Sequence, residues 1–179
     1  MTQPQLALVT GASSGIGLEL AKQFALNGYD LVVAAEDDAI RDVAGQLSQW
    51  SAAVQPIQVD LRTPEGVEHL YQSAIEGDRV LAAAALNAGV GRGEMFLKSE
   101  LADDLSIVDL NVRSTVHLAK LVLRDMANRD SGKCCSPRPS RPRCRVRISR
   151  YTTHRSRSSS RSLRRSVTNC ATPQSPSRR

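Results

Sequence analysis

Apolar residues follow two alternating patterns along the first 133 positions of the chain. Short runs that are almost wholly apolar are typical of parallel strands covered on both faces. Between these runs, apolar residues recur every three or four positions, as they do on one face of a helix. The runs predict strands at 5–10, 30–35, 54–59 and 80–86, and the intervening segments predict helices at 16–27, 37–49, from 63 onward and at 101–129. This alternation predicts a doubly wound α/β sheet built from four β-α units.

A glycine-rich segment lies directly after the first predicted strand. Residues 10–17 read Thr-Gly-Ala-Ser-Ser-Gly-Ile-Gly, so the glycines have the spacing G-x3-G-x-G. Glycine lets a strand-to-helix turn approach a pyrophosphate closely, and a helix N-terminus offers free N–H groups and the positive end of a dipole. Doubly wound sheets bind their ligands outside the carboxyl ends of the strands, where this segment lies. It therefore predicts a dinucleotide site, and the alternative is a tight turn without a ligand.

Polar residues also follow the later strands and occupy the long predicted helix. They are Asp60 and Leu61 after the third strand, Asn87, Ala88 and Gly89 after the fourth, and Asn111 on the helix. Taken singly, each has an ordinary alternative: a loop acid or helix cap, a polar turn, and a solvated helix asparagine. Together with the glycine-rich segment, in this order and at this spacing, they resemble the short-chain dehydrogenase/reductase family over about residues 5–133.

The resemblance implies both a fold and an activity. The fold is an incomplete Rossmann-type sheet with the strand order 3-2-1-4. The activity is that of an oxidoreductase which transfers a hydride between NAD(P) and a small alcohol or carbonyl substrate. In that family the residue matching Asp60 hydrogen-bonds the adenine ring, and the Asn-Ala-Gly segment steadies the central sheet and lines the ribose. The residue matching Asn111 helps to hold a water in the proton relay, so Asn111 is the one predicted catalytic residue.

Three acidic residues, Glu36, Asp37 and Asp38, follow the second predicted strand. NADP carries its extra 2′-phosphate at this point and normally needs Arg or Lys there, and the glycine-rich segment contains neither. Carboxylates repel that phosphate but accept hydrogen bonds from the free ribose hydroxyls of NAD, so the sequence favours NAD over NADP. The alternative is that these acids only belong to the first turn of the next helix. The predicted cofactor-binding residues are Gly11, Ser13, Ser14, Gly15, Ile16, Gly17, Glu36, Asp60, Leu61, Asn87, Ala88 and Gly89.

Charge divides the chain into two unlike parts. Residues 1–133 contain 11 Lys or Arg and 18 Asp or Glu, a net charge of −7, whereas residues 134–179 contain 13 Arg and no acid. All four cysteines lie in 134–179 at a spacing that fits no zinc site, and no secretion signal opens the chain. No apolar run approaches the roughly 18–20 residues of a membrane span. We therefore expect a cytoplasmic protein without membrane contact, with an NAD(P)-binding domain at 1–133 and a disordered Arg/Ser/Pro-rich tail at 134–179.

The part of the family's active site that moves protons has no match in this sequence. The family uses a Tyr, a Lys four residues later and a Ser about a dozen residues before the Tyr, carried on a fifth strand and a fifth helix. The segment after Lys133 has the apolar pattern of neither element, and we interpret the spacing of Tyr151 and Arg155 as coincidence. We therefore expect a chain without catalysis, in which the fourth strand is an exposed edge. The family's dimer helix is also partly lost, which leaves the oligomeric state open.

The tail has two interpretations. Its arginines are compatible with a basic arm that binds nucleic acid. Alternatively, the residues from 134 onward are translated in the wrong frame. In the neighbouring frame, 134–141 is compatible with V-L-F-T-S-S-I-A, 151–158 with V-Y-N-A-S-K-S-F, and 161–170 with S-F-A-E-A-L-R-N-E-L. These resemble the family's fifth strand with its catalytic serine, its Tyr-x-x-x-Lys segment and an amphipathic helix. We therefore favour the loss of one base near codon 133 and do not expect a nucleic-acid partner.

Overall fold

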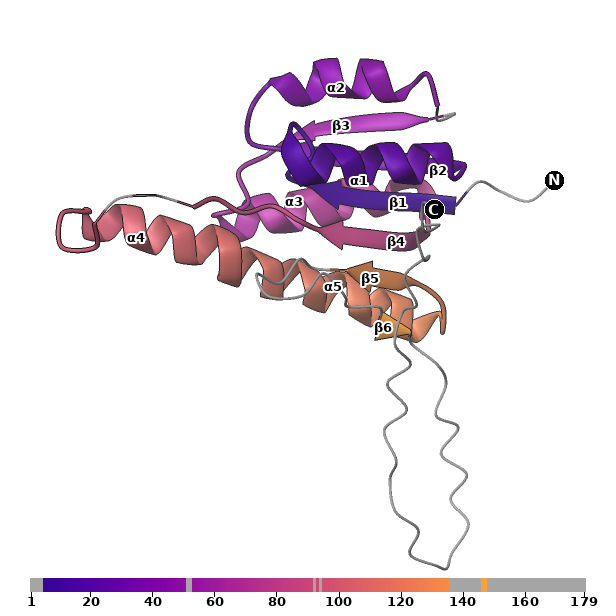
Figure 1. Cartoon of the computed structure of the whole chain (residues 1–179). Helices are drawn as coiled ribbons and strands as arrows, with labels where there is room; N and C mark the ends of the chain where they lie inside the picture. The colour runs from indigo at the N-terminus through magenta and orange to yellow at the C-terminus, as the bar shows by residue number, and fades with distance from the viewer. Residues whose placement is uncertain (1–4, 51–52, 92, 94, 136–145, 148–179) are drawn as a thin grey trace, which may run out of the picture.

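The computed structural model describes residues 5–50, 53–91, 93, 95–135 and 146–147. These residues form a sheet with helices on both faces, and its strand order is β3-β2-β1-β4-β5-β6 (Figure 1). The strands are β1 (Gln5–Thr10), β2 (Tyr29–Ala35), β3 (Val54–Gln58), β4 (Leu81–Leu86), β5 (Lys133–Cys135) and β6 (Val146–Arg147). The helices are α1 (Gly15–Leu26), α2 (Ala39–Leu47), α3 (Pro64–Ile75), the 3-10 turn η1 (Glu76–Asp78), α4 (Leu101–Val108), the π-helical turn η2 (Asp109–Ser114) and α5 (Thr115–Asn128). The predicted doubly wound α/β class and the order 3-2-1-4 are confirmed.

The four central strands begin and end within one residue of their predicted bounds, and all pairs among them are parallel. Helix α3 shows why its start could be predicted so closely. The Thr63 hydroxyl accepts a hydrogen bond from the N–H of Gly66 at 3.0 Å, and Pro64 occupies the first turn, where a missing N–H costs nothing. The described part of the chain contains no helix that is both long and apolar enough to span a membrane. The predicted disordered tail lies outside the described residues, apart from its first two positions and the two residues of β6.

The pleat of the central strands explains why helices cover both faces of the sheet. Alternate residues of a strand point to opposite faces. In β1 this sends Leu6 and Leu8 into a core with α3 and α5, and it sends Ala7 and Val9 into a second core with α1 and α2. All four side chains are buried. The almost continuous apolar runs of the sequence therefore reflect two hydrophobic cores, one on each face.

The long predicted helix is present but is not uniform. Between α4 and α5 the backbone widens into a π-helical turn, in which Leu110 and Ser114 are buried. The Ser114 hydroxyl donates a hydrogen bond to the Leu110 carbonyl. Such turns insert one residue into a helix and are frequent at functional sites. Apolar periodicity did not reveal this turn, which carries Asn111.

The prediction that the fourth strand forms an exposed edge is wrong. β5 pairs with β4 in the parallel sense, with Lys133 beside Ala83, and β6 pairs with β5 in the antiparallel sense. The chain turns back to the sheet through Gly132, whose φ of 137° suits glycine and where a Cβ would overlap Met126. A strand forms here because the backbone N–H and C=O groups of β4 gain partners, although the segment has little apolar pattern. The predicted boundary between residues 133 and 134 therefore falls inside β5.

Candidate functional site

A cavity of about 200 Å³ lies at the carboxyl ends of β1, β2, β3 and β4. Its walls are the segments that directly follow these strands, together with one residue of η2. The lining residues are Gly11, Ser13, Ser14, Ala35, Glu36, Asp37, Val59, Asp60, Leu61, Ala88, Gly89, Val90 and Leu110. Eight of the predicted cofactor-binding residues are among them. The other four are close along the chain: Gly15, Ile16 and Gly17 form the first turn of α1, and Asn87 follows β4.

Two glycines of the β1–α1 turn adopt backbone conformations that other residues rarely take. Gly11 has a φ of 64° and Gly15 a φ of 56°. Gly17 is required for a different reason, because a Cβ on it would overlap the carbonyl oxygen of Gly11 and lie 2.7 Å from Nδ2 of Asn87. The first turn of α1 therefore packs directly against the end of β1 and against the segment after β4. This close approach is what the G-x3-G-x-G spacing provides.

The N-terminus of α1 is left free of side-chain caps. Ser14 precedes the helix in an extended conformation, its side chain makes no capping hydrogen bond, and the first turn contains no acidic residue. The first N–H groups of a helix have no intrahelical partners and carry the positive end of the helix dipole. At the wall of the cavity these groups can bind an anion such as a pyrophosphate, so the residues present fit a dinucleotide.

Hydrogen bonds tie the Asn87-Ala88-Gly89 segment to the end of β1. The Thr10 hydroxyl accepts hydrogen bonds from the N–H groups of Asn87 and Ala88, each at 3.0 Å. The Asn87 amide donates in turn to the Gly11 carbonyl at 3.4 Å. Thr10 is one of two buried polar residues in the described part of the chain. It was not among the predicted site residues, and its signal in the sequence is a hydroxyl at the end of an otherwise apolar strand.

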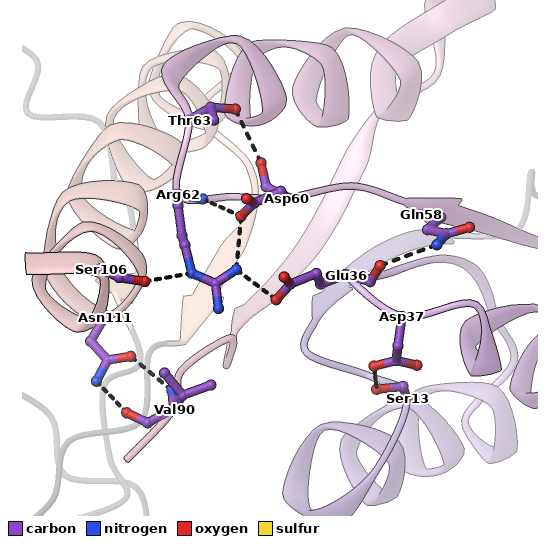
Figure 2. Close-up of polar contacts among 10 residues, drawn as sticks. All are labelled: Ser13, Glu36, Asp37, Gln58, Asp60, Arg62, Thr63, Val90, Ser106 and Asn111. Carbon is purple, nitrogen blue, oxygen red and sulfur yellow. Dashed lines mark hydrogen bonds and ion pairs between the residues drawn. The ribbon is translucent and has the colours of Figure 1, made fainter. Parts of the chain in front are cut away.

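Asn111 holds the next residues of the same loop. Its Oδ1 accepts a hydrogen bond from the N–H of Val90 at 2.9 Å, and its Nδ2 donates to the carbonyl of Val90 at 2.8 Å (Figure 2). A Cβ on Gly89 would lie 3.1 Å from the same Oδ1. Both ends of the amide are therefore occupied by the Val90 backbone. The described contacts make Asn111 a residue that positions the loop after β4.

A salt bridge joins the segment after β2 to the segment after β3, at one side of the site. The Arg62 Nη1 atom lies 2.6 Å from Glu36 Oε2 and 3.1 Å from Asp60 Oδ1, and its Nε donates to the Ser106 hydroxyl at 2.9 Å (Figure 2). The pKa of Arg62 is raised above its ordinary value, chiefly by the hydrogen bond to Glu36, with Asp60 adding to it and burial opposing it. The Asp60 carboxylate, expected at the adenine ring, also accepts the N–H of Arg62 at 2.9 Å. Sequence reasoning missed Arg62 because its partner Glu36 lies 26 positions earlier.

The described wall of the cavity carries carboxylates and serine hydroxyls, but not the Tyr and Lys that the family resemblance assigns to proton transfer. Among the described residues that line the cavity there is no Tyr, Lys, His or Cys. The described residues also contain no cluster of His, Cys, Asp and Glu that could hold a metal ion. Tyr151 and Arg155 lie outside the described residues.

A sequence model of the family described as short chain dehydrogenase matches residues 5–135. The chain belongs to this family. The match spans β1 to β5 and contains every residue placed in or beside the cavity. The oxidoreductase class and the Rossmann-type, NAD(P)-binding fold expected from the sequence are therefore confirmed at the level of the family.

The chain spans about half the length of the curated short-chain dehydrogenase relatives it matches. Oxidoreductase UcpA of Salmonella typhimurium is 31% identical over 127 residues, which cover 71% of this chain and 48% of that protein. A probable NADP-dependent dehydrogenase of Haemophilus influenzae is 29% identical over 129 residues, covering 71% and 50%. Among solved structures, L-sorbose reductase from Gluconobacter frateurii, complexed with NADPH and L-sorbose, has a TM-score of 0.69 and 29% identity over 75% of this chain and 52% of that one.

Proposed function

We propose that this chain is the cofactor-binding part of a short-chain dehydrogenase that interconverts an alcohol and a carbonyl, and that the chain as written binds the dinucleotide without catalysis. The observation that carries the proposal is the uncapped N-terminus of α1, which follows a glycine turn at the wall of the cavity. Bound NAD(P) would supply the hydride donor or acceptor. The backbone N–H groups of α1 would hold the pyrophosphate, and Asn111 would hold the loop after β4 in place through Val90.

The cofactor is proposed as NAD(P), with NAD preferred. The acidic residues Glu36 and Asp37 line the cavity, and carboxylates repel a 2′-phosphate. The L-sorbose reductase neighbour was solved with NADPH, and another relative is named as NADP-dependent, so these relatives do not support the preference for NAD. The preference for NAD rests on the charge of this chain's own residues.

The loss of catalysis is proposed on chemical grounds. Reduction of a carbonyl needs a proton donor beside the substrate oxygen, and the reverse reaction needs a base. The polar side chains on the described wall of the cavity are two serines and three carboxylates, and each carboxylate is already paired, with Arg62 or with Ser13. In the neighbouring reading frame, residues 134–141 and 151–158 are compatible with the family's serine and its Tyr-x-x-x-Lys segment. We therefore propose that one base was lost near codon 133.

Two observations beyond that codon support the frameshift. The family match ends at residue 135, and all 13 arginines of the tail come after residue 133, together with all four cysteines. Resequencing the gene across codon 133 is the direct test, and we expect one additional base that restores the family's reading frame. An unchanged reading frame, with the same Arg-rich extension in close relatives, would exclude the frameshift.

A functional test compares the chain as written with the frame-restored chain. Both proteins are given NADH or NADPH and a panel of small ketones and aldehydes, and cofactor oxidation is followed by absorbance. We expect both chains to bind NADH and only the frame-restored chain to turn over a substrate. Turnover by the chain as written would contradict the proposed loss of catalysis.

We also propose that the protein is located in the cytoplasm, and cell fractionation would test this.

The 13 arginines of residues 134–179 support one alternative, a dinucleotide-binding protein with a nucleic-acid-binding arm. Binding through arginines to phosphates falls steeply as salt increases. Salt-dependent binding of DNA or RNA by the full chain, weakened on removal of residues 148–179 with eight of the 13 arginines, would favour this alternative. That deletion retains β5 and β6, so the sheet keeps its described strands. Absence of salt-dependent binding would favour the out-of-frame interpretation.

A further inference from the structure

The acidic residues that line the cavity are not isolated charges. Glu36 and Asp60 share the guanidinium of Arg62, at 2.6 Å and 3.1 Å from its Nη1 atom. Asp37 accepts a hydrogen bond from the Ser13 hydroxyl at 2.8 Å. The guanidinium of Arg62 therefore lies among carboxylates that, without it, would repel a phosphate. This charge comes from the segment after β3, and neither the glycine-rich segment nor the residues directly after β2 supply it.

Arg62 is held in this place by more than one element. Its Nε donates to Ser106 of α4, while Nη1 contacts Glu36 after β2 and Asp60 after β3. Only 24% of its side chain is exposed. The remaining terminal nitrogen, Nη2, donates none of the hydrogen bonds found among the described residues, and Figure 2 shows it pointing away from both carboxylates. The guanidinium is thus fixed by its other nitrogens and keeps two N–H donors for a further acceptor.

We infer that Arg62 is a specificity-determining residue, which sets the ratio of NADPH to NADH binding in this chain. The inference rests on the proposed dinucleotide binding. By pairing with Glu36, Arg62 offsets part of the repulsion that a 2′-phosphate would meet, and its free donors are of the kind that bind phosphate most strongly. The chain would then bind NADPH measurably despite three consecutive acids at 36–38. A purely structural Arg62 would affect both dinucleotides alike.

The test is a fluorescence titration of the full chain with NADH and with NADPH, repeated for variants of the pair. Arg62→Ala should weaken NADPH binding about tenfold more than NADH binding, because it removes a charged donor and leaves two carboxylates unpaired. Arg62→Lys should give an intermediate ratio, because the ammonium keeps the charge but has no second terminal nitrogen for the phosphate. Glu36→Gln should shift the ratio toward NADPH, because the carboxylate is replaced by a neutral amide. Lys22→Ala removes the same charge from an exposed pair with Glu19 on α1, and should leave the ratio unchanged.

The outcomes separate the inference from the proposed function. Equal loss of both dinucleotides in Arg62→Ala, with an unchanged ratio in Glu36→Gln, would overturn the inference and leave the proposed function standing. Saturable binding of neither dinucleotide to the unaltered chain would overturn both. If circular dichroism shows that Arg62→Ala does not fold, Arg62→Gln decides, because it removes the charge and keeps most of the side chain: a ratio shifted toward NADH supports the inference, and an unchanged ratio overturns it.

Discussion

Two helices on opposite sides of the sheet differ in how many of their residues are buried. Helix α2, beside the β3 end, buries four residues in nine. Helix α4, which leads into the β4 and β5 end, buries none in eight. Its apolar residues instead continue through η2 into α5 as an exposed row at helical spacing, which we call the apolar row. The apolar row consists of Leu101, Leu105, Val108, Val112 and Val116.

In the proposed function, the two ends correspond to the cofactor side and the substrate side of the site. The β1–β4 strand ends that form the cavity lie between two filled cores, and the proposed cofactor-binding residues belong to them. The end that would support the substrate and the proton-moving residues has a three-residue β5 and the apolar row. The part of the chain that matches its curated relatives covers about half of their length. In the proposed function, this part holds the dinucleotide site and lacks residues of the catalytic one.

The largest combined effect, on folding and on NADH binding together, is expected at the contact between α1 and β1. Gly17→Ala would place a Cβ against the Gly11 carbonyl, so it should lower the free energy of unfolding by about 1–3 kcal/mol or more and abolish NADH binding. Gly45→Ala is the matched control, because a Cβ there meets open space in α2. It should raise the free energy of unfolding by about 0.5–1 kcal/mol. Urea unfolding and NADH titration measure both, and equal effects at the two glycines would refute the proposed packing.

The buried and exposed sides of the long helix give the next largest effect. Leu118 is 2% exposed in the core beneath α5, whereas Leu105 in the apolar row is 52% exposed. Leu118→Ala should cost about 2–5 kcal/mol in the free energy of unfolding. Leu105→Ala should change it by less than about 0.5 kcal/mol. Chemical denaturation of both variants checks this, and a large loss for Leu105→Ala would show that another surface covers the apolar row.

A smaller effect is expected where β1 holds the loop after β4. Thr10→Val removes the acceptor of two N–H groups while keeping the shape of the side chain, and should cost about 1–3 kcal/mol. Thr10→Ser keeps the hydroxyl and should lose less stability and retain NADH affinity. Thermal unfolding with and without NADH separates the two roles. Valine and serine variants of equal stability would contradict the bonding assigned to Thr10.

Substitutions in the apolar row should have the smallest effect on the free energy of unfolding. They should have a clear effect on self-association. Replacing Leu105 and Val116 by Lys should change the free energy of unfolding by no more than about 0.5 kcal/mol each. It should reduce self-association, because exposed apolar patches favour it. Leu97→Lys is the control, since Leu97 is exposed outside the apolar row. Light scattering over a range of protein concentrations gives the result, and equal association of all variants would remove the apolar row as its cause.

The comparison also shows what the sequence could predict. The four central strands, the glycine turn and the residues after β3 and β4 follow from patterns within one segment, and local chemistry determines them. The Glu36–Arg62 pair could not be predicted in the same way, because it joins segments that meet only when β2 and β3 align. The π-helical turn around Asn111 was not predicted, because one inserted residue barely changes the apolar periodicity. Strand β5 was not predicted, because it forms through main-chain pairing with β4 and not through a pattern of side chains.

A fluorescence titration of the full chain with NADH, with Gly17→Ala titrated in parallel, tests the central claim most directly. The structure predicts saturable binding of one NADH per chain, displaced by NAD and absent in the variant. Binding without saturation, or equal binding by the chain and the variant, would contradict a dinucleotide site at the first turn of α1.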